Sequence, residues 1–198
     1  MDLLAGHDTS EFWDRGYSIA PDLIDGRQLA FARTVMNLSE RNGLMVHRTG
    51  VVPEGALNEY SPPIAIRLLR HCLPAIEAAV GKKLLPTYAL WRIYGHGAQL
   101  KRHLDREACE VSATITLDAQ PLRPAWPIWF RDLAGNEVSV ALPAGSAALY
   151  QGIRVEHWRE PYVGQRQCQL FLHYVVADGP NAIHADDQAR RHAADRME

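Results

Sequence analysis

Hydrophobic positions in the first part of the chain recur at helical spacing. Across residues 21–41 apolar side chains return every three or four positions, and a second stretch of the same kind covers 62–80. Residues 42–61, which lie between the two, are rich in glycine and proline and predict a loop. We therefore expect a helical N-terminal part over about 10–82, with one long loop in it.

After residue 83 the pattern changes to short β-rich segments separated by turn residues. Apolar and polar side chains alternate along 110–118, as in a strand with one buried face. The segments are 84–94, 110–118, 126–131, 137–142, 146–151 and 168–176. They predict an antiparallel sandwich or barrel over about 83–177, with the two helices on the outer face of one sheet. The polar tail, 178–198, predicts a surface helix or a frayed end.

Composition narrows the class of protein without naming an activity. A chain of 198 residues is expected to form a single domain, 1–198. With 21 basic and 23 acidic residues it has no basic excess, which argues against a nucleic-acid partner. There is no apolar run of membrane length and no basic leader, and the three cysteines form no CxxC pair. We expect a cytoplasmic protein with reduced thiols and no membrane partner; the oligomeric state stays open.

One short motif carries metal chemistry. His103 and Asp105 are separated by a single residue, so on an extended strand both side chains point to the same side. A third ligand would complete a facial triad of two histidines and one carboxylate, which leaves coordination positions open for reactants. His157 is the best candidate, because a jelly-roll chain can return beside its earlier strand after four or five strands. His96 and His173 compete with it for this role.

A basic residue follows at the start of the last apolar segment. Arg166 would be costly inside a barrel unless it met an anion, and guanidinium groups bind carboxylates in a bidentate manner. A dicarboxylate that chelates the metal at one end could place its other carboxylate there. A strand-edge surface charge is the ordinary alternative for Arg166.

In this order and spacing, the four residues resemble the motif of the iron(II)/2-oxoglutarate-dependent oxygenases, whose fold is a double-stranded β-helix (a jelly roll, cupin-like). The runs RIYGHGAQLKRHLD and CEVSATITLD resemble the strand pair around HxD in prolyl-4-hydroxylase-type members. The run GSAALYQGIRVEHWREPYVGQR resembles their distal segment, and FWDRGYSIAPDLIDGRQLAFAR resembles the N-terminus of phytanoyl-hydroxylase-like members. The resemblance covers most of 10–176 and implies a mainly β fold with flanking helices.

The resemblance also implies a cofactor set and an activity. Iron(II) would be held by His103, Asp105 and His157. The co-substrate 2-oxoglutarate would chelate the iron and place its far carboxylate at Arg166, with Thr116 and Tyr94 in the same pocket; dioxygen would be the oxidant. Prolyl hydroxylases often have tyrosine where this chain has Leu100, and some members have a tyrosine at the position of Thr116; both differences weaken the case for a peptidyl-proline substrate. A carboxylate at Asp105 favours hydroxylation or desaturation over halogenation.

The substrate and two competing classes complete the expectations. We favour a small amino-acid-like or carboxylate-bearing metabolite, with loop 42–61 as a lid. Arg106 and Arg159 could meet a substrate carboxylate, with Trp91 and Trp158 nearby; solvated charges and core aromatics are the alternative reading. A peptidyl hydroxylase, a cupin-like metalloprotein without 2-oxoglutarate and a non-catalytic binding module remain as alternatives.

Overall fold

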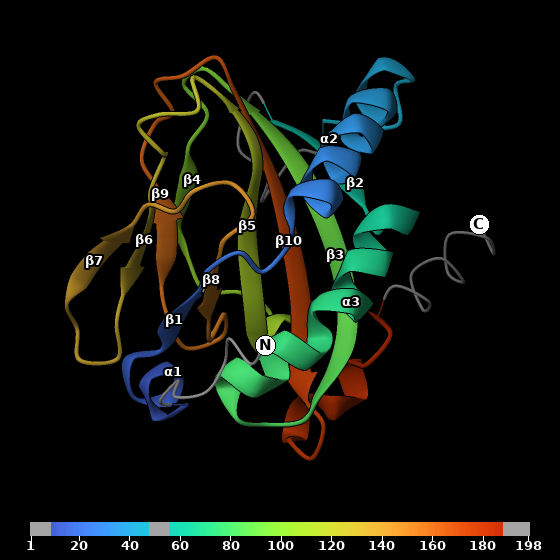
Figure 1. Ribbon diagram of the computed structural model, residues 1–198. Helices are drawn as coiled ribbons and strands as arrows, with labels where there is room; N and C mark the ends of the chain where they lie inside the picture. The colour runs from blue at the N-terminus through green and yellow to red at the C-terminus, as the bar shows by residue number, and fades with distance from the viewer. Residues whose placement is uncertain (1–8, 48–55, 188–198) are drawn as a thin grey trace.

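The computed structural model describes residues 9–47 and 56–187, and two antiparallel sheets dominate it. The longer sheet has six strands in the order β1-β8-β5-β10-β3-β2, and the smaller has four in the order β4-β9-β6-β7 (Figure 1). The strands are β1 (Tyr17–Ala20), β2 (Ala56–Tyr60), β3 (Leu84–Gly95), β4 (Leu100–His103), β5 (Val111–Gln120), β6 (Ile128–Arg131), β7 (Glu137–Val140), β8 (Ala147–Tyr150), β9 (His157–Arg159) and β10 (Arg166–Val176). Strands β3 to β10 form the jelly roll, the fold that the sequence predicts, with eight strands where the sequence pattern marked six segments.

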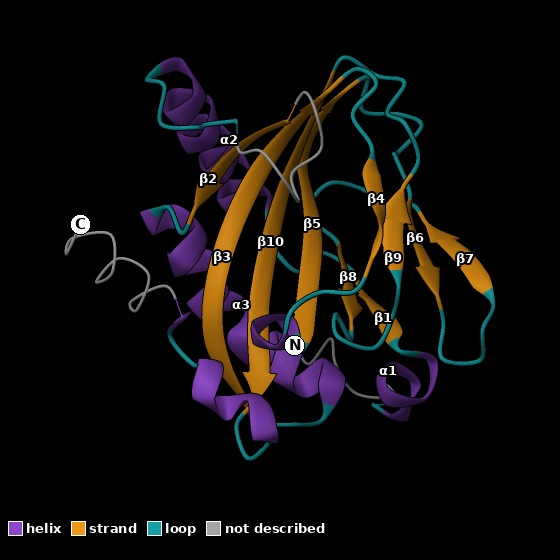
Figure 2. Cartoon of the chain, turned by 180° about the vertical axis from the view of Figure 1, so that it is seen from behind, coloured by secondary structure: helices purple, strands orange, loops and turns teal. Residues whose placement is uncertain are grey.

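The helices are α1 (Ser10–Arg15), α2 (Gly26–Arg41) and α3 (Pro63–Val80), with short 3-10 turns at Glu107–Cys109 and Pro180–His184. As predicted, α2 and α3 pack on the outer face of one sheet, the six-stranded one (Figures 1 and 2). The four-stranded sheet lies on its other side. None of the helices within 9–47 and 56–187 has the length and apolar character that a membrane crossing needs.

The helix predicted over 21–41 is α2, and it begins later than the periodicity indicates. Its start is Gly26 and not residue 21, because Asp25 caps it: the Asp25 carboxylate accepts hydrogen bonds from the backbone N–H groups of Arg27 and Gln28. The Gln28 side chain in turn accepts from the Asp25 N–H, which completes a capping box. Residue Asp22 has a φ of 47°, so the chain turns where the helix was expected to begin.

The N-terminal part is also less helical than expected over 10–82. Strand β1 pairs with β8, and β2 pairs along its whole length with β3, so both extend the six-stranded sheet at its edges. The expected loop 42–61 therefore ends in a strand at Ala56. Residues 48–55 of the predicted lid and 188–198 of the predicted tail lie outside the described residues.

Strand β10 shows how the six-stranded sheet divides the molecule into two layers. Its residues Cys168, Leu170, Leu172 and Tyr174 are buried with the apolar side chains of α2 and α3. We call this side of the sheet the helix face. The alternate residues, such as Gln169 and His173, point to the other side, toward the four-stranded sheet, and we call that side the barrel face.

Candidate metal centre

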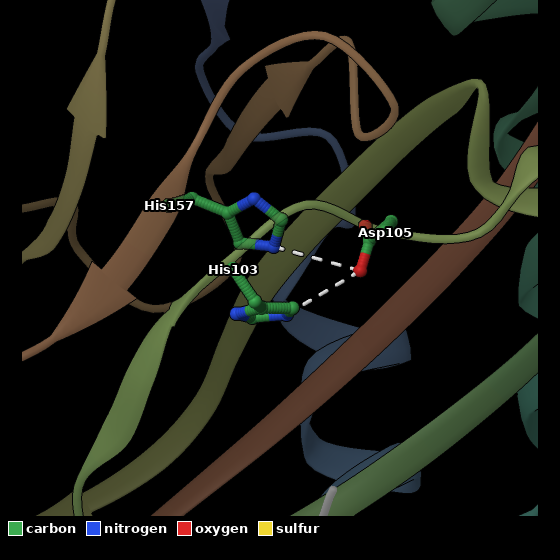
Figure 3. A group of neighbouring side chains, drawn as sticks. All are labelled: His103, Asp105 and His157. Atoms are coloured by element: carbon green, nitrogen blue, oxygen red, sulfur yellow. Dashed lines mark ion pairs between the residues drawn. The ribbon is translucent and has the colours of Figure 1, made fainter.

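Two neighbouring strands of the four-stranded sheet bring the histidines together. His103 is the last residue of β4 and His157 the first of β9, and the two are direct cross-strand partners. Their ring centroids are 4.3 Å apart. Asp105 follows β4 by two residues, and its backbone N–H donates to the carbonyl of Gly152 at 2.8 Å. The three side chains converge on one point, as Figure 3 shows.

The ligand atoms face one another with free lone pairs. Asp105 Oδ1 lies 3.5 Å from His103 Nε2 and 3.6 Å from His157 Nε2. The Nδ1 atom of each ring lies close to a backbone carbonyl, that of Lys101 at 2.8 Å and that of Val155 at 3.0 Å. A carbonyl can only accept, so both Nδ1 atoms carry the proton and both Nε2 lone pairs point inward. This is the tautomer that a metal requires.

The carboxylate supplies the test of whether a cation fits. Asp105 Oδ2 is buried and has no hydrogen-bond partner among the described residues. A buried carboxylate oxygen without a partner is costly, and a divalent cation would satisfy it. Two imidazoles and one carboxylate are also the donor set expected for iron(II). The residues present therefore fit the metal.

Burial and mutual interaction set the protonation of the triad. Burial lowers the pKa of His157, whose side chain is 2% exposed. Burial opposes ionisation of Asp105, but the neighbouring imidazoles of His103 and His157 hold its pKa below the usual range. For His103, burial is outweighed by the neighbouring Asp105 carboxylate, which raises the pKa of the ring. The carboxylate is thus ionised and the buried histidine neutral, the forms that bind metal.

One glycine permits the close approach of two loops at the triad. A Cβ atom on Gly152 would lie 2.4 Å from the Cys109 carbonyl oxygen and 2.6 Å from Asp105 Oδ2. Only glycine leaves room for the Asp105 carboxylate beside this backbone. The glycine of the Tyr-x-Gly run before His157 is therefore part of the site's construction.

A second group shares Asp105. Its carboxylate, the Cys109 thiol and His173 have ligand atoms within 4.8 Å of one another. His173 Nδ1 lies 2.8 Å from the Ser112 hydroxyl, and the Cys109 sulfur lies 3.0 Å from the Tyr88 hydroxyl. Burial lowers the pKa of His173 to about 4 and raises that of the Cys109 thiol. His173 therefore stands beside the triad.

The other candidate histidine lies elsewhere. His96 is in an exposed turn, with Nδ1 3.3 Å from the Gly164 carbonyl oxygen, and is not brought to the triad.

Two of the residues assigned to the co-substrate lie on the barrel face. The Thr116 hydroxyl donates to Gln169 Oε1 at 3.2 Å and accepts from Gln167 Nε2 at 3.1 Å. Tyr94 is fully buried, and its hydroxyl accepts a hydrogen bond from Arg92 Nη1 at 3.0 Å. Both positions are consistent with a pocket inside the jelly roll.

The third, Arg166, is not where the motif placed it. Its guanidinium turns to the helix face and donates to Glu40 Oε2 at 2.7 Å and to Asn37 Oδ1 at 2.8 Å, both on α2. Side-chain alternation along β10 puts residue 166 on the same side as Cys168, which its Nη1 contacts at 2.8 Å. The expectation that Arg166 points into the barrel is wrong.

The two tryptophans assigned to the substrate also lie outside the barrel. Trp91 is buried on the helix face, and its Nε1 donates to Glu59 Oε2 at 2.8 Å. Trp158 lies next to His157 on β9, so it points to the opposite side of the four-stranded sheet, where it stacks on Trp129 and under Arg102. Both are structural, and the assignment of Trp91 and Trp158 to the site is wrong.

The two arginines assigned to the substrate differ from each other. Arg106 pairs with Asp187 Oδ2 at 2.6 Å, and its guanidinium lies 4.5 Å from the centroid of the Tyr88 ring. Arg159 is 2% exposed and donates from Nη1 to the Trp126 carbonyl oxygen at 2.7 Å. Burial lowers its pKa to about 10. Arg106 therefore stands at the edge of the site and Arg159 within the protein.

Sequence reasoning missed several polar residues of the barrel face. Gln167 and Gln169 are each 1% exposed, and Asn58 on β2 accepts a hydrogen bond from Arg92 Nε at 2.5 Å. A signal was present for the glutamines, which occupy alternate positions of an otherwise apolar final strand. No such signal marked Asn58, which lies in the expected loop.

Comparison with known proteins finds relatives in structure and none in sequence. The chain matches no protein-family model and no curated protein. A prolyl-4-hydroxylase from Pseudomonas putida is similar in structure, with a TM-score of 0.67 and 18% identity over 87% of this chain and 98% of that one. The epimerase SnoN, in complex with Fe3+, alpha ketoglutarate and nogalamycin RO, has a TM-score of 0.71 and 15% identity over 90% and 88%.

An oxidoreductase of the 2OG-Fe(II) oxygenase family from Burkholderia pseudomallei has a TM-score of 0.68 and 12% identity over 93% of this chain and 95% of that one. These similarities extend over nearly the whole described jelly roll. The chain therefore has the jelly-roll fold of the 2OG-Fe(II) oxygenases, as its sequence motif predicted.

Proposed function

We propose that this protein is an iron(II)- and 2-oxoglutarate-dependent dioxygenase. The observation that carries the proposal is the triad of His103, Asp105 and His157, with inward lone pairs and an unsatisfied carboxylate oxygen, inside a jelly roll. The similarity to SnoN supports it, because that protein was crystallised with Fe3+ and alpha ketoglutarate, which is 2-oxoglutarate.

When bound, iron(II) with 2-oxoglutarate and dioxygen supplies the oxidising power to hydroxylate an unactivated carbon, while 2-oxoglutarate is converted to succinate and carbon dioxide. The chain's own residues hold and shield the metal. His103 and His157 are fixed by their backbone carbonyl partners, and Asp105 contributes one negative charge. The rings of Tyr150 and Phe130 pack near His157 and exclude water from that side.

For the substrate we propose a small amino-acid-like or carboxylate-bearing metabolite. The support is Arg92, on the barrel face of β3, which bonds to Asn58 and Tyr94 and has no carboxylate within 4 Å among the described residues. The Asn58 amide nitrogen beside it is buried without a hydrogen-bond partner in the described part of the chain. A cation and a spare amide donor favour an anionic ligand.

A peptidyl hydroxylase is the second candidate. The observation in its favour is the structural similarity to a prolyl-4-hydroxylase, which covers 98% of that chain. The two candidates share the metal site and differ in the substrate that stimulates turnover.

The metal and co-substrate are tested by anaerobic addition of iron(II) and 2-oxoglutarate, followed by oxygen. We expect a visible absorption band and then succinate, and His157→Ala should lose both, because two protein ligands hold iron poorly against water. Trp158→Phe is the matched control, since Trp158 is the next residue on β9 but points away from the triad, and it should keep both. A cupin-like protein without 2-oxoglutarate chemistry would bind metal and give no band.

The substrate class is tested by succinate release with a panel of free amino acids, related acids and proline-containing peptides. We expect stimulation by one or more of the small acids. Stimulation by peptides alone would contradict the small-molecule proposal and favour the peptidyl hydroxylase.

A further inference from the structure

Arg159 is a buried cation without a counter-charge. It is 2% exposed, no carboxylate lies within 4 Å of it among the described residues, and its Nε has no hydrogen-bond partner there. Its contacts are one carbonyl, that of Trp126, and the Trp126 ring, whose centroid is 4.9 Å from the guanidinium carbon. A buried charge in such surroundings is costly unless an anion joins it.

The position of Arg159 relates it to the metal centre. It lies two residues after His157 on β9, so both side chains point to the same side of the four-stranded sheet, about 7 Å apart along the strand. The triad lies at the His157 end of this stretch of β9, and the guanidinium group belongs to the residue at its other end. A short dicarboxylate that chelates the metal could span the interval and bring its second carboxylate to the guanidinium.

The barrel face of the six-stranded sheet presents polar groups to the same layer. Tyr94 and Gln167 are direct partners across β3 and β10, and Gln167 Oε1 is buried without a hydrogen-bond partner in the described chain. The Tyr94 hydroxyl accepts from Arg92, which leaves its own proton free to donate. A cavity of about 390 Å³ on this side of the sheet is lined by residues that include Thr116, Trp126 and Gln167, but not Arg159 or the triad.

We propose that Arg159, and not Arg166, holds the far carboxylate of 2-oxoglutarate; this rests on the proposed dioxygenase function. Arg166 would have to leave Glu40 and Asn37 and pass to the other side of its sheet to take that role. Arg159 already points inward and lacks an anion. The metal ligand His157 and the co-substrate anchor then share one short strand, which fixes the distance between them.

The test compares two 2-oxo acids of equal length. With anaerobic iron(II) enzyme, the absorption band is titrated with 2-oxoglutarate and with 2-oxopentanoate, which has a methyl group in place of the far carboxylate. Wild type should prefer 2-oxoglutarate. Arg159→Gln should weaken 2-oxoglutarate about 30-fold or more, as for loss of one partner of a buried charge pair, and leave 2-oxopentanoate unchanged. Arg166→Gln is the matched control and should change neither affinity.

A second measurement does not use the metal. Arg159→Leu should raise the unfolding temperature of the ligand-free protein or leave it unchanged, because it removes an uncompensated buried charge. Glutarate should raise the unfolding temperature of metal-free wild type and not that of Arg159→Leu. A structural role for Arg159 predicts the opposite, a strongly destabilised variant.

The outcomes separate the two proposals. If wild type binds 2-oxoglutarate and Arg159→Gln keeps the preference for it, or if Arg166→Gln loses that preference, the inference about Arg159 is overturned and the dioxygenase function stands. If the iron-loaded wild type binds neither acid, both are overturned.

Discussion

The two faces of the six-stranded sheet differ in the polarity of their buried side chains, although the same strands supply both. On the helix face, β10 presents Cys168, Leu170, Leu172 and Tyr174 to an apolar layer, and the one hydroxyl there donates to the Leu69 carbonyl oxygen at 2.7 Å. On the barrel face, β10 presents Gln167, Gln169, Phe171 and His173, and β5 adds Ser112, Thr114 and Thr116. The helix face thus belongs to a packed apolar core, whereas the barrel face carries many polar side chains.

The difference is clearest in the polar atoms left without partners. Among the described residues these atoms are Asn58 Nδ2, Asp105 Oδ2, Arg159 Nε and Gln167 Oε1, together with Ser18 Oγ on β1 and Trp129 Nε1 on β6. None of these residues belongs to the apolar layer beneath the helices. Buried polar groups are usually satisfied, so the four at Asn58, Asp105, Arg159 and Gln167 support a ligand site between the two sheets. We therefore expect the helix face to contribute mainly to the stability of the fold and the barrel face to contribute to ligand binding.

The largest effect that would sharpen this comparison is on stability. Leu170→Ala, at a fully buried position of the helix face, should lower the free energy of unfolding by about 3 kcal/mol, because it leaves a cavity beneath the helices. Urea denaturation measures the loss. The affinity for 2-oxoglutarate should stay within about twofold, and a parallel collapse of both quantities would break the comparison.

A smaller effect belongs to the barrel face and depends on pH. Burial lowers the pKa of His173 from 6.5 to about 4; the titratable groups around it are Asp105, Arg106, His157 and Arg92. Between these two values the unfolded chain binds the extra proton, so stability is full above pH 6.5 and falls as pH drops toward 4. The difference corresponds to roughly 3 kcal/mol at most.

His173→Gln in metal-free protein should therefore show a shallower decline of stability between pH 6.5 and 4. Urea denaturation at a series of pH values, with a chelator present, gives the slope. A slope equal to that of wild type would assign the acid sensitivity to other groups.

The smallest effect concerns the charge pair that holds Arg166 on the helix face. Glu40→Gln removes the carboxylate 2.7 Å from Nη2, on a partly exposed pair, and should lower the free energy of unfolding by about 1 kcal/mol or less. The difference from wild type should shrink in 1 M salt. If Glu40→Gln instead tightened or weakened 2-oxoglutarate binding, Arg166 would take part in the site after all.

The sequence was sufficient for features that depend on local pattern. The alternation along 110–118 predicted β5, and the spacing of His103 and Asp105 predicted that the two side chains converge, which they do although Asp105 lies two residues beyond the end of β4. The choice of His157 as third ligand followed from the return of a jelly-roll chain; the strand register places it opposite His103, and its role as a ligand stays a prediction. These predictions needed only the periodicity of strands and one topological rule.

What failed depended on which side of a strand a residue takes. A shift of the strand register by one residue moves every side chain to the opposite face of the sheet. The residues before β10 do not show whether Arg166 or Gln167 points inward. Strand β9 has three residues, too few to display a period, so the sequence did not show that Arg159 is buried. Tertiary pairing decided both cases.

The backbone contacts of the two histidines have a consequence for how the sequence can vary. In each case the ring is held by the carbonyl two residues earlier, Lys101 for His103 and Val155 for His157. A carbonyl is present whatever the side chain, so the orientation of the ligands makes no demand on residue type at these positions. The Val155 side chain is buried in an apolar cluster, which restricts the residue types that fit there, whereas position 101 is exposed and tolerates other residue types. Exposed residues around the metal centre can therefore be substituted during evolution without changing the orientation of the two histidine ligands.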